Sequence, residues 1–414
     1  MMLTTTSKGY NEARLGFQRR AQHRPAVIFA VTSAAEVEEA VRYAIDQDLP
    51  IAVQASGHGL IRPLDGGVLI ATRAFNGVTV DAETRTAWVE AGATWREVID
   101  ATAPYGLAPL SGSAPGVGAI AYTLGGGLGL MARRFGYAAD HVRRIEVVTP
   151  DGVRRNAEED PDLFWALRGG GGNFGVVTRM EIELFEVSTL YGGSLYFDLA
   201  VHPRLPEIWR DWTRDVPEEV TSAIALVPMP DIPQVPAPLR GQHVGQVQLA
   251  ILGDRGEELV KPLRAIGEAL QDTVDDLPYQ ESGRVFAEPE NPGSYTSGNV
   301  LLNDLKTLPD LAKARRHVVA IRHLGGALAR HPEIPNAVGR REAAYSLTVL
   351  TPGGDTDPKV LDPWRESAIG RALNFTFAQL TDAEIADAYD DYERLVTLRR
   401  RYDPARRLQA NHRL

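Results

Sequence analysis

The sequence contains no cysteine, and this absence excludes several kinds of chemistry at once. Without a thiol, the chain cannot form disulfides, thiolate metal sites, a cysteine nucleophile or a cysteinyl bond to a cofactor. The nine histidines are scattered without ligand spacing, so we predict no metal site. A chain without cysteine is compatible with a reducing compartment, and we expect a cytoplasmic protein.

Long apolar runs and an excess of positive charge are also missing. No stretch approaches the ~20 apolar residues that a membrane helix requires, and residues 1–16 lack the apolar core of a signal peptide. The formal net charge is -10, so we expect no nucleic-acid partner. The chain has 414 residues, of which 44% are hydrophobic, and this is typical of a globular protein with two or three domains. Nothing in the sequence indicates its oligomeric state.

Two patterns of secondary structure follow each other along the chain. Up to about residue 187, short strand patterns alternate with short helices, and capping motifs at Ser33 and Thr94 predict two helix starts. Beyond that point the strand and helix patterns are longer, and Thr381 begins a last helix. The strand patterns span residues 26–29, 49–53, 68–72, 77–81, 87–90, 144–148, 153–156, 176–184, 190–197, 222–228, 244–252 and 345–350. The later helical patterns span residues 203–214, 257–272, 311–323 and 381–396. Together they predict an α+β fold whose second half contains an open antiparallel sheet.

Glycine-rich loops mark the first part of the chain, at residues 56–59, 112–129 and 169–175. Glycine lets backbone N–H groups approach a pyrophosphate closely. Among the first 175 residues Lys8 is the single lysine, so three such loops indicate a phosphate held by the main chain. The first loop also presents His58 between two glycines. Each loop alone is equally compatible with an ordinary turn.

One stretch of the second loop fits the sequence motif of a different cofactor site. Residues 127–132 fit the pattern G-x-G-x-x-A, which opens the first strand–helix unit of a Rossmann domain. In that fold an acidic residue ends the next strand, about 20 residues on. Glu146 lies at nearly that spacing, but inside its strand and within a hairpin-like pattern. The context therefore argues against a Rossmann domain.

Seven motifs in order resemble the berberine bridge enzyme-like branch of the vanillyl-alcohol oxidase/PCMH flavoprotein family. They are Gly57-His58, residues 115–129, 136–142, 147–152 and 162–178, Asn374-Phe375, and Tyr402-Asp403-Pro404 with Asn411. The resemblance covers nearly the whole chain. It implies a PCMH-type FAD-binding domain of two α+β subdomains at residues 1–187. It further implies a substrate domain with an antiparallel sheet flanked by helices at residues 188–370, and a C-terminal segment, residues 371–414, that returns to the FAD-binding domain.

The resemblance implies FAD as the cofactor, attached through His58. Family members with two covalent links carry a cysteine where this chain has Ala114, so only the histidyl link remains. Val117 matches a position beside the reactive part of the flavin. The further cofactor-binding residues that the resemblance implies are Gln54, Ala55, Ser56, Gly57, Gly59, Gly112, Ser113, Gly118, Gly125, Gly126, Gly127, Gly129, Asp140, Val142, Gly175, Val177, Asn374 and Asn411.

The activity implied by the resemblance is that of an FAD-dependent oxidase. Hydride from an alcohol, amine or activated C–H group of a small organic molecule would pass to flavin N5, and then to O2. A dehydrogenase, a monooxygenase-like catalyst or a non-redox protein with structural FAD are the alternatives. Candidates for the catalytic base are Tyr122, His323 and Tyr345, the last of which alternation places on one face with Leu347. For each of the three, a packing role is the competing interpretation.

Overall fold

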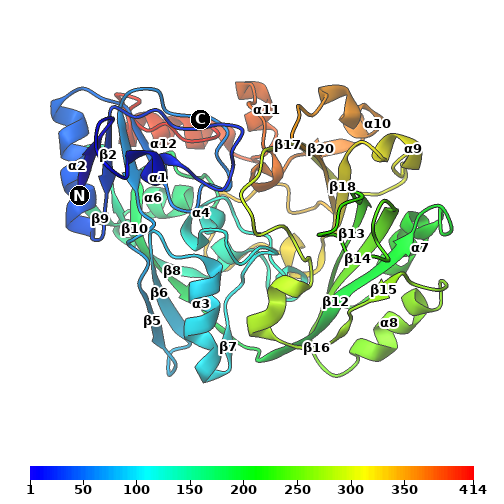
Figure 1. Cartoon of the computed structure of the whole chain (residues 1–414). Helices are drawn as coiled ribbons and strands as arrows, with labels where there is room; N and C mark the ends of the chain where they lie inside the picture. Colours follow the sequence, from blue (N-terminus) through cyan, green and yellow to red (C-terminus); the bar gives the residue numbers. More distant parts are fainter.

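The computed structural model describes residues 1–414, with the exception of the side chain of Pro358. Within the described residues, the strands form sheets of four, five, two and nine strands. Figure 1 shows two lobes: the two smaller main sheets lie on the left with the C-terminal helix α12 (Tyr392–Tyr402), and the nine-stranded sheet lies on the right. This architecture confirms the predicted α+β fold class. None of the described helices has the length and apolar character needed to cross a bilayer.

The strands and helices have the following bounds. The strands are β1 Met2–Thr4, β2 Val27–Ala30, β3 Ile51–Gln54, β4 Val68–Ala71, β5 Val78–Asp81, β6 Thr86–Glu90, β7 Leu107–Ala108, β8 Val142–Val148, β9 Arg154–Asn156, β10 Val176–Glu183, β11 Phe185–Glu186, β12 Thr189–Asp198, β13 Val220–Pro228, β14 His243–Ile251, β15 Gln271–Asp272, β16 Asp275–Pro278, β17 Tyr295–Leu302, β18 Val318–His323, β19 Tyr345–Pro352 and β20 Ala368–Gly370. The other helices are α1 Tyr10–Arg14, α2 Ala34–Asp46, α3 Trp95–Thr102, α4 Ala119–Leu124, α5 Ala132–Phe135, α6 Pro161–Leu167, α7 Leu205–Thr213, α8 Gly256–Arg264, α9 Leu311–Ala314, α10 Asp362–Arg365 and α11 Asp382–Ala386. Every strand pattern of the sequence corresponds to one of these strands.

The left lobe is built around helix α2, which packs between two sheets. One is the four-stranded sheet, in the order β1-β2-β4-β3, and the other is the five-stranded antiparallel sheet, in the order β5-β6-β10-β8-β9. The apolar stripe of α2, including Val37 and Val41, joins Val68 of the first sheet and Val148 of the second in one buried cluster. Strand β3 is thereby fixed, and the loop that carries His58 follows directly from it.

The C-terminal segment extends this arrangement towards the same loop. Ile51 of β3 donates its N–H to the carbonyl of Arg407, and its own carbonyl accepts from Gln409. The carboxylate of Asp403 accepts the N–H groups of Arg407 and Leu408, at 2.8 and 3.0 Å, and so shapes the turn after α12. The last residues of the chain, including Asn411, are therefore held beside the end of β3.

The nine-stranded antiparallel sheet has two chemically different faces. Its order is β15-β12-β14-β13-β18-β19-β17-β20, with β16 also paired to β12. The register aligns Val247, Ile224, Ile321, Leu347 and Val300 across five strands, and all of them are buried in one apolar cluster with residues of α7 and α8. We call this the outer face. The residues that alternate with these point to the opposite side, which we call the inner face.

Several predicted helices are wrong in length or kind. Residues 311–323 form only the short helix α9 and then strand β18, because the β-branched residues Val319 and Ile321 pack on the outer face of the sheet. The helix predicted at 257–272 ends at Arg264. The helix predicted from Thr381 is interrupted, and Asp391 caps a second helix, α12.

Two of the predicted helix starts are confirmed in full. Thr94 and Thr381 form reciprocal capping boxes with Glu97 and Glu384. At Ser33 the cap is one-sided, because the carboxylate of Glu36 accepts from Thr32 instead.

Candidate functional site

The loop after β3 is held in place by the N-terminal segment that precedes β2, which we call the arm. Phe17 donates its N–H to the carbonyl of Ser56 at 2.9 Å, and Gln18 donates to the carbonyl of Gly57 at 3.0 Å. Gly57 has a φ of +71°, and a Cβ at this position would lie 2.6 Å from the Cα of Gly16. Only glycine permits this left-handed backbone and this close crossing of two chains.

His58 lies in a half-buried position with one ring nitrogen engaged. Its Nδ1 is 2.9 Å from the Oγ of Ser56, and its ring stacks on Phe17 with 3.9 Å between centroids. Its carbonyl accepts the hydroxyl proton of Tyr295 at 2.7 Å. Its Nε2 has no hydrogen-bond partner among the described residues and lies near Gly116, where a Cβ would be 3.9 Å away. Burial lowers the pKa of His58 to about 4, so the imidazole is neutral at neutral pH.

Ser56 connects the His58 loop to the second glycine-rich loop. Its Oγ accepts the N–H of Gly118 at 3.1 Å, directly before helix α4. The same loop is fixed from the other side by helix α3, because Trp95 donates its N–H to the carbonyl of Val117. Ser56, His58, Gly116 and Gly118 thus lie close together.

Tyr122 lies at the centre of the second glycine-rich loop. A Cβ at Gly112 or at Gly127 would lie within 2.8 Å of the Tyr122 ring, so these glycines make room for that ring. Gly129 approaches the carbonyl of Ser111 in the same way. The Tyr122 hydroxyl is buried and has no hydrogen-bond partner among the described residues. Burial raises its pKa, so Tyr122 stays a neutral phenol.

The asparagines predicted as cofactor ligands also reach these loops. Asn374 donates from Nδ2 to the carbonyl of Tyr122 at 3.1 Å and occupies the space that a side chain at Gly125 would take. Asn411 accepts the N–H of Ile61 at 3.1 Å and lies against Gly59. Both side chains bring the C-terminal segment to the loops.

Further predicted cofactor residues make contacts within the protein. Asp140 forms an ion pair with Arg341 at 2.6 Å, and both side chains are buried. Gly175 packs closely against Val147, which also pairs with Val177 across the sheet. Val142 is buried in the core, and Gly126 packs beside Val338. Gln54, at the end of β3, donates to the carbonyl of Arg14 in the arm.

Two of the three candidate bases, His323 and Tyr345, belong to strands of the nine-stranded sheet and make packing contacts there. The Tyr345 hydroxyl is 2.8 Å from Thr213 Oγ1 of α7, within the apolar cluster of the outer face. His323 Nε2 is 2.9 Å from a guanidinium nitrogen of Arg133, and burial together with that charge lowers the His323 pKa to about 3. This geometry favours a packing role for Tyr345 and His323, and it leaves Tyr122 as the candidate beside the loops.

Arg322 was not predicted from the sequence as a site residue. It lies on β18, on the inner face, and its Nη2 donates to the Oγ of Ser113 at 3.2 Å, so it connects the sheet to the second glycine-rich loop. Its guanidinium carbon lies over the rings of Phe286 and Phe375, at 4.4 and 4.8 Å. Alternation along β18 would have placed Arg322 opposite Val319 and Ile321, but the stretch had been interpreted as a helix.

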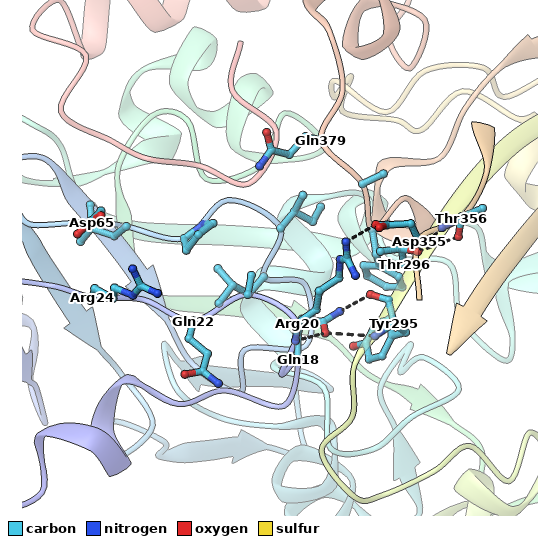
Figure 2. Close-up of a pocket in the computed structure, with 17 residues that line it drawn as sticks. Gln18, Arg20, Gln22, Arg24, Asp65, Tyr295, Thr296, Asp355, Thr356 and Gln379 are labelled. Atoms are coloured by element: carbon cyan, nitrogen blue, oxygen red, sulfur yellow. Dashed lines mark hydrogen bonds and ion pairs between the residues drawn. The ribbon is translucent and has the colours of Figure 1, made fainter. Parts of the chain in front are cut away.

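A surface cavity of about 800 Å³ lies beside the arm. Figure 2 shows its polar lining, which includes Gln18, Arg20, Arg24 and Asp355. Arg20 and Asp355 form an ion pair across it. Among the described residues that line it there is no predicted site residue, although Tyr295 connects it to the His58 loop.

Comparison with known proteins identifies the cofactor-binding part of the chain. Residues 25–157 match the family model of the FAD binding domain. The chain is 26% identical to the uncharacterized FAD-linked oxidoreductase YgaK of Bacillus subtilis, over 97% of this chain and 94% of that protein. This protein is an FAD-dependent oxidoreductase. It is also 26% identical to (R)-6-hydroxynicotine oxidase of Paenarthrobacter nicotinovorans, over 95% of this chain and 92% of that one.

Solved structures show that this oxidoreductase has the predicted fold. The crystal structure of 6-hydroxy-D-nicotine oxidase from Arthrobacter nicotinovorans matches with a TM-score of 0.84 at 22% identity, over 98% of this chain and 96% of the other. The BBE-like 1 protein of Physcomitrella patens matches with a TM-score of 0.82 at 19% identity, over 100% and 96% of the two chains. These two likenesses show that the chain has the same fold as both proteins over nearly its whole length.

The residues present fit an FAD molecule at the meeting point of the loops. The neutral Nε2 of His58 has no hydrogen-bond partner among the described residues. The buried hydroxyl of Tyr122 also has no hydrogen-bond partner among them. Gly116 is exposed, and a Cβ there would meet the His58 ring at ordinary contact distance. Ser56, His58, Gly116 and Gly118 are therefore the residues that we expect to hold the cofactor.

Proposed function

We propose that this oxidoreductase is an oxidase of a small organic molecule. Bound FAD would supply the redox chemistry, by accepting hydride from an alcohol, amine or activated C–H group and passing the electrons to O2. The observation that carries the proposal is the meeting of the His58 loop, the 112–118 loop and the inner face of the nine-stranded sheet, where Arg322 bonds to Ser113. The 26% sequence identity to (R)-6-hydroxynicotine oxidase supports the oxidase chemistry.

The roles that we propose for the three parts of the chain follow the fold. Residues 1–187 would bind FAD, residues 188–370 would bind the substrate, and residues 371–414 would return to the FAD-binding part. The nine-stranded sheet supports this division, because its strands run from β12 to β20, between Thr189 and Gly370. The inner face would then form one wall of the substrate site and the glycine-rich loops the other.

His58 would carry the covalent link to FAD in this proposal. A neutral imidazole has a free lone pair, and burial keeps His58 neutral at neutral pH. The stacked ring of Phe17 and the hydroxyl of Ser56 hold the imidazole in one orientation. His58 would thus hold the FAD through one imidazole nitrogen, and the FAD would supply the redox chemistry.

Tyr122 would bind the substrate as a neutral hydrogen-bonding group. Its raised pKa makes the phenolate rare at neutral pH, so the hydroxyl can donate to or accept from a substrate heteroatom, but it is a poor resident base. A buried hydroxyl without a partner costs free energy, and a bound substrate that satisfies it would recover part of that cost.

Stopped-flow reoxidation tests the oxidase proposal. The purified protein would be reduced anaerobically by light with EDTA and then mixed with air-saturated buffer, and the flavin absorbance would be followed. Return of the oxidised spectrum within seconds, with hydrogen peroxide formed in equal amount, supports an oxidase. Reoxidation over many minutes, together with fast reoxidation by an artificial acceptor, would instead establish a dehydrogenase.

A further inference from the structure

The inner face of the nine-stranded sheet is partly exposed at Arg322. Along β18 the exposure alternates: Val319, Ile321 and His323 are buried, whereas Val318, Ala320 and Arg322 are partly exposed. Side chains of one strand alternate between the two faces, so the partly exposed set belongs to the inner face. The inner face is therefore partly exposed at Arg322, although its neighbours Ala223 and Ser346 are buried.

The residues beside Arg322 on that face are small or uncharged. Register places Ala223 of β13 and Ser346 of β19 directly opposite Arg322 on its two sides. Gln248 follows Ala223 in the same row. Directly opposite residues of antiparallel strands share a face, so Arg322 is the cation within a row of short or neutral side chains. Nothing in this row pairs with its charge.

The guanidinium of Arg322 is fixed in place but not saturated. The rings of Phe286 and Phe375 lie against it, and Ser113 accepts one bond from Nη2. Nε and Nη1 donate to no described residue. A guanidinium presents its donors as a planar fork that matches a carboxylate with two parallel bonds. Arg322 is thus held rigid with part of that fork available.

The one carboxylate near Arg322 among the described residues is a weak partner. Glu288 lies 3.7 Å away, too far for a hydrogen bond, and its side chain is 41% exposed while that of Arg322 is 16% exposed. An ion pair with one exposed partner contributes little to stability. Burial lowers the pKa of Arg322, which means that the protein environment leaves its charge incompletely compensated. A second anion at this place would be favourable.

We propose that Arg322 binds a carboxylate of the substrate, so that the oxidised molecule is a small organic acid. The proposal rests on the proposed function, because it places the substrate between the inner face and the glycine-rich loops. The carboxylate would accept from the open donors of Arg322 and displace Glu288. Ser113 and the two phenylalanine rings would keep the guanidinium in position while the substrate enters and leaves.

Difference spectroscopy of the flavin tests this assignment, with benzoate as the probe and benzamide as its neutral counterpart. The flavin-loaded wild type should bind benzoate at least ~30-fold more tightly than the Arg322→Gln variant does, because a buried charged hydrogen-bond pair is lost. Benzamide should bind both proteins weakly and alike. Glu288→Gln should bind benzoate more tightly than the wild type, since the competing carboxylate is gone. Arg255→Gln serves as the matched control, because Arg255 is exposed and pairs with Glu258 on α8.

Two results would overturn the assignment. One is equal affinity of the wild type and Arg322→Gln for benzoate, and the other is a preference of the wild type for benzamide. The flavin content of Arg322→Gln and its reoxidation by O2 after photoreduction separate this proposal from the oxidase proposal. If both are normal and benzoate does not discriminate, the carboxylate assignment alone is wrong. If the wild type itself is not reoxidised by O2, the oxidase proposal is wrong, whatever benzoate does.

Discussion

Replacement of Gly57 by alanine tests whether the crossing of the arm and the His58 loop organises the site. The φ of +71° costs an L-residue about 1–2 kcal/mol. The added Cβ would lie 2.6 Å from the Cα of Gly16, which is backbone and cannot rotate away, and forced overpacking of this kind costs about 1–3 kcal/mol. We therefore expect Gly57→Ala to lower the free energy of unfolding by about 2–5 kcal/mol, the sum of these two costs.

The same change should also reduce flavin occupancy. Relief of the clash requires the loop to move away from Gly16, and this movement breaks the bonds from Phe17 and Gln18 that position His58. Urea unfolding followed by tryptophan fluorescence measures the stability, and the ratio of flavin absorbance to protein absorbance measures the occupancy.

Gly59→Ala is the matched control, two residues further along the same loop. Its φ lies outside the left-handed region, and a Cβ there would meet its nearest atom, Asn411 Nδ2, at 3.7 Å. We expect a change in stability within about 0.5 kcal/mol, because the added Cβ would make only an ordinary contact. Equal stability and equal flavin content of the two variants would refute the reasoning.

Four further outcomes follow from the structure. Asp140→Ala should cost about 3–5 kcal/mol in urea unfolding, because it leaves the buried Arg341 without its partner, and a loss below 1 kcal/mol would contradict the pairing. Tyr345→Phe should lose about 1 kcal/mol through the Thr213 bond and keep its turnover number, whereas a large fall in turnover would restore Tyr345 as a base. Tyr122→Phe should keep the stability, since its hydroxyl has no partner among the described residues, and should lower turnover or raise KM; unchanged kinetics would exclude its proposed role. Burial lowers the pKa of His323 to about 3 from an ordinary 6.5. The contribution of the neutral His323 to the free energy of unfolding is therefore fully present above pH 6.5 and is lost as the pH falls towards 3, at about 1.4 kcal/mol per pH unit. His323→Asn should flatten the acid limb of the stability profile by one proton.

Local sequence signals predicted the elements whose cause is local. The reciprocal caps at Thr94 and Thr381 depend on residues three positions apart, and the hairpin of β5 and β6 on neighbouring strands; both occur in the structure. Strand β18 was missed for the opposite reason. Its residues alternate only relative to the sheet, through partners such as Ala225 opposite Ala320, almost a hundred residues away in sequence. Without those partners, the same apolar residues also fit a helix.

The site shows the same limit. The glycines of the second loop suggested backbone contact with a phosphate, but Gly112 and Gly127 also make room for the ring of Tyr122, which no local pattern indicates. Arg322 acquires its importance from Ser113, 209 residues away, and from two aromatic rings in other segments. Its role depends on the fold as a whole and could not be predicted from its neighbours.

Intact-protein mass spectrometry after acid denaturation tests the central claim about His58 most directly. If His58 carries the cofactor, the wild-type chain should have the mass of its sequence plus one FAD, and peptide mapping should place the added mass on the peptide that contains His58. The His58→Ala chain should have the mass of the polypeptide alone. A wild-type chain without added mass, or added mass on a peptide that lacks His58, would contradict the claim.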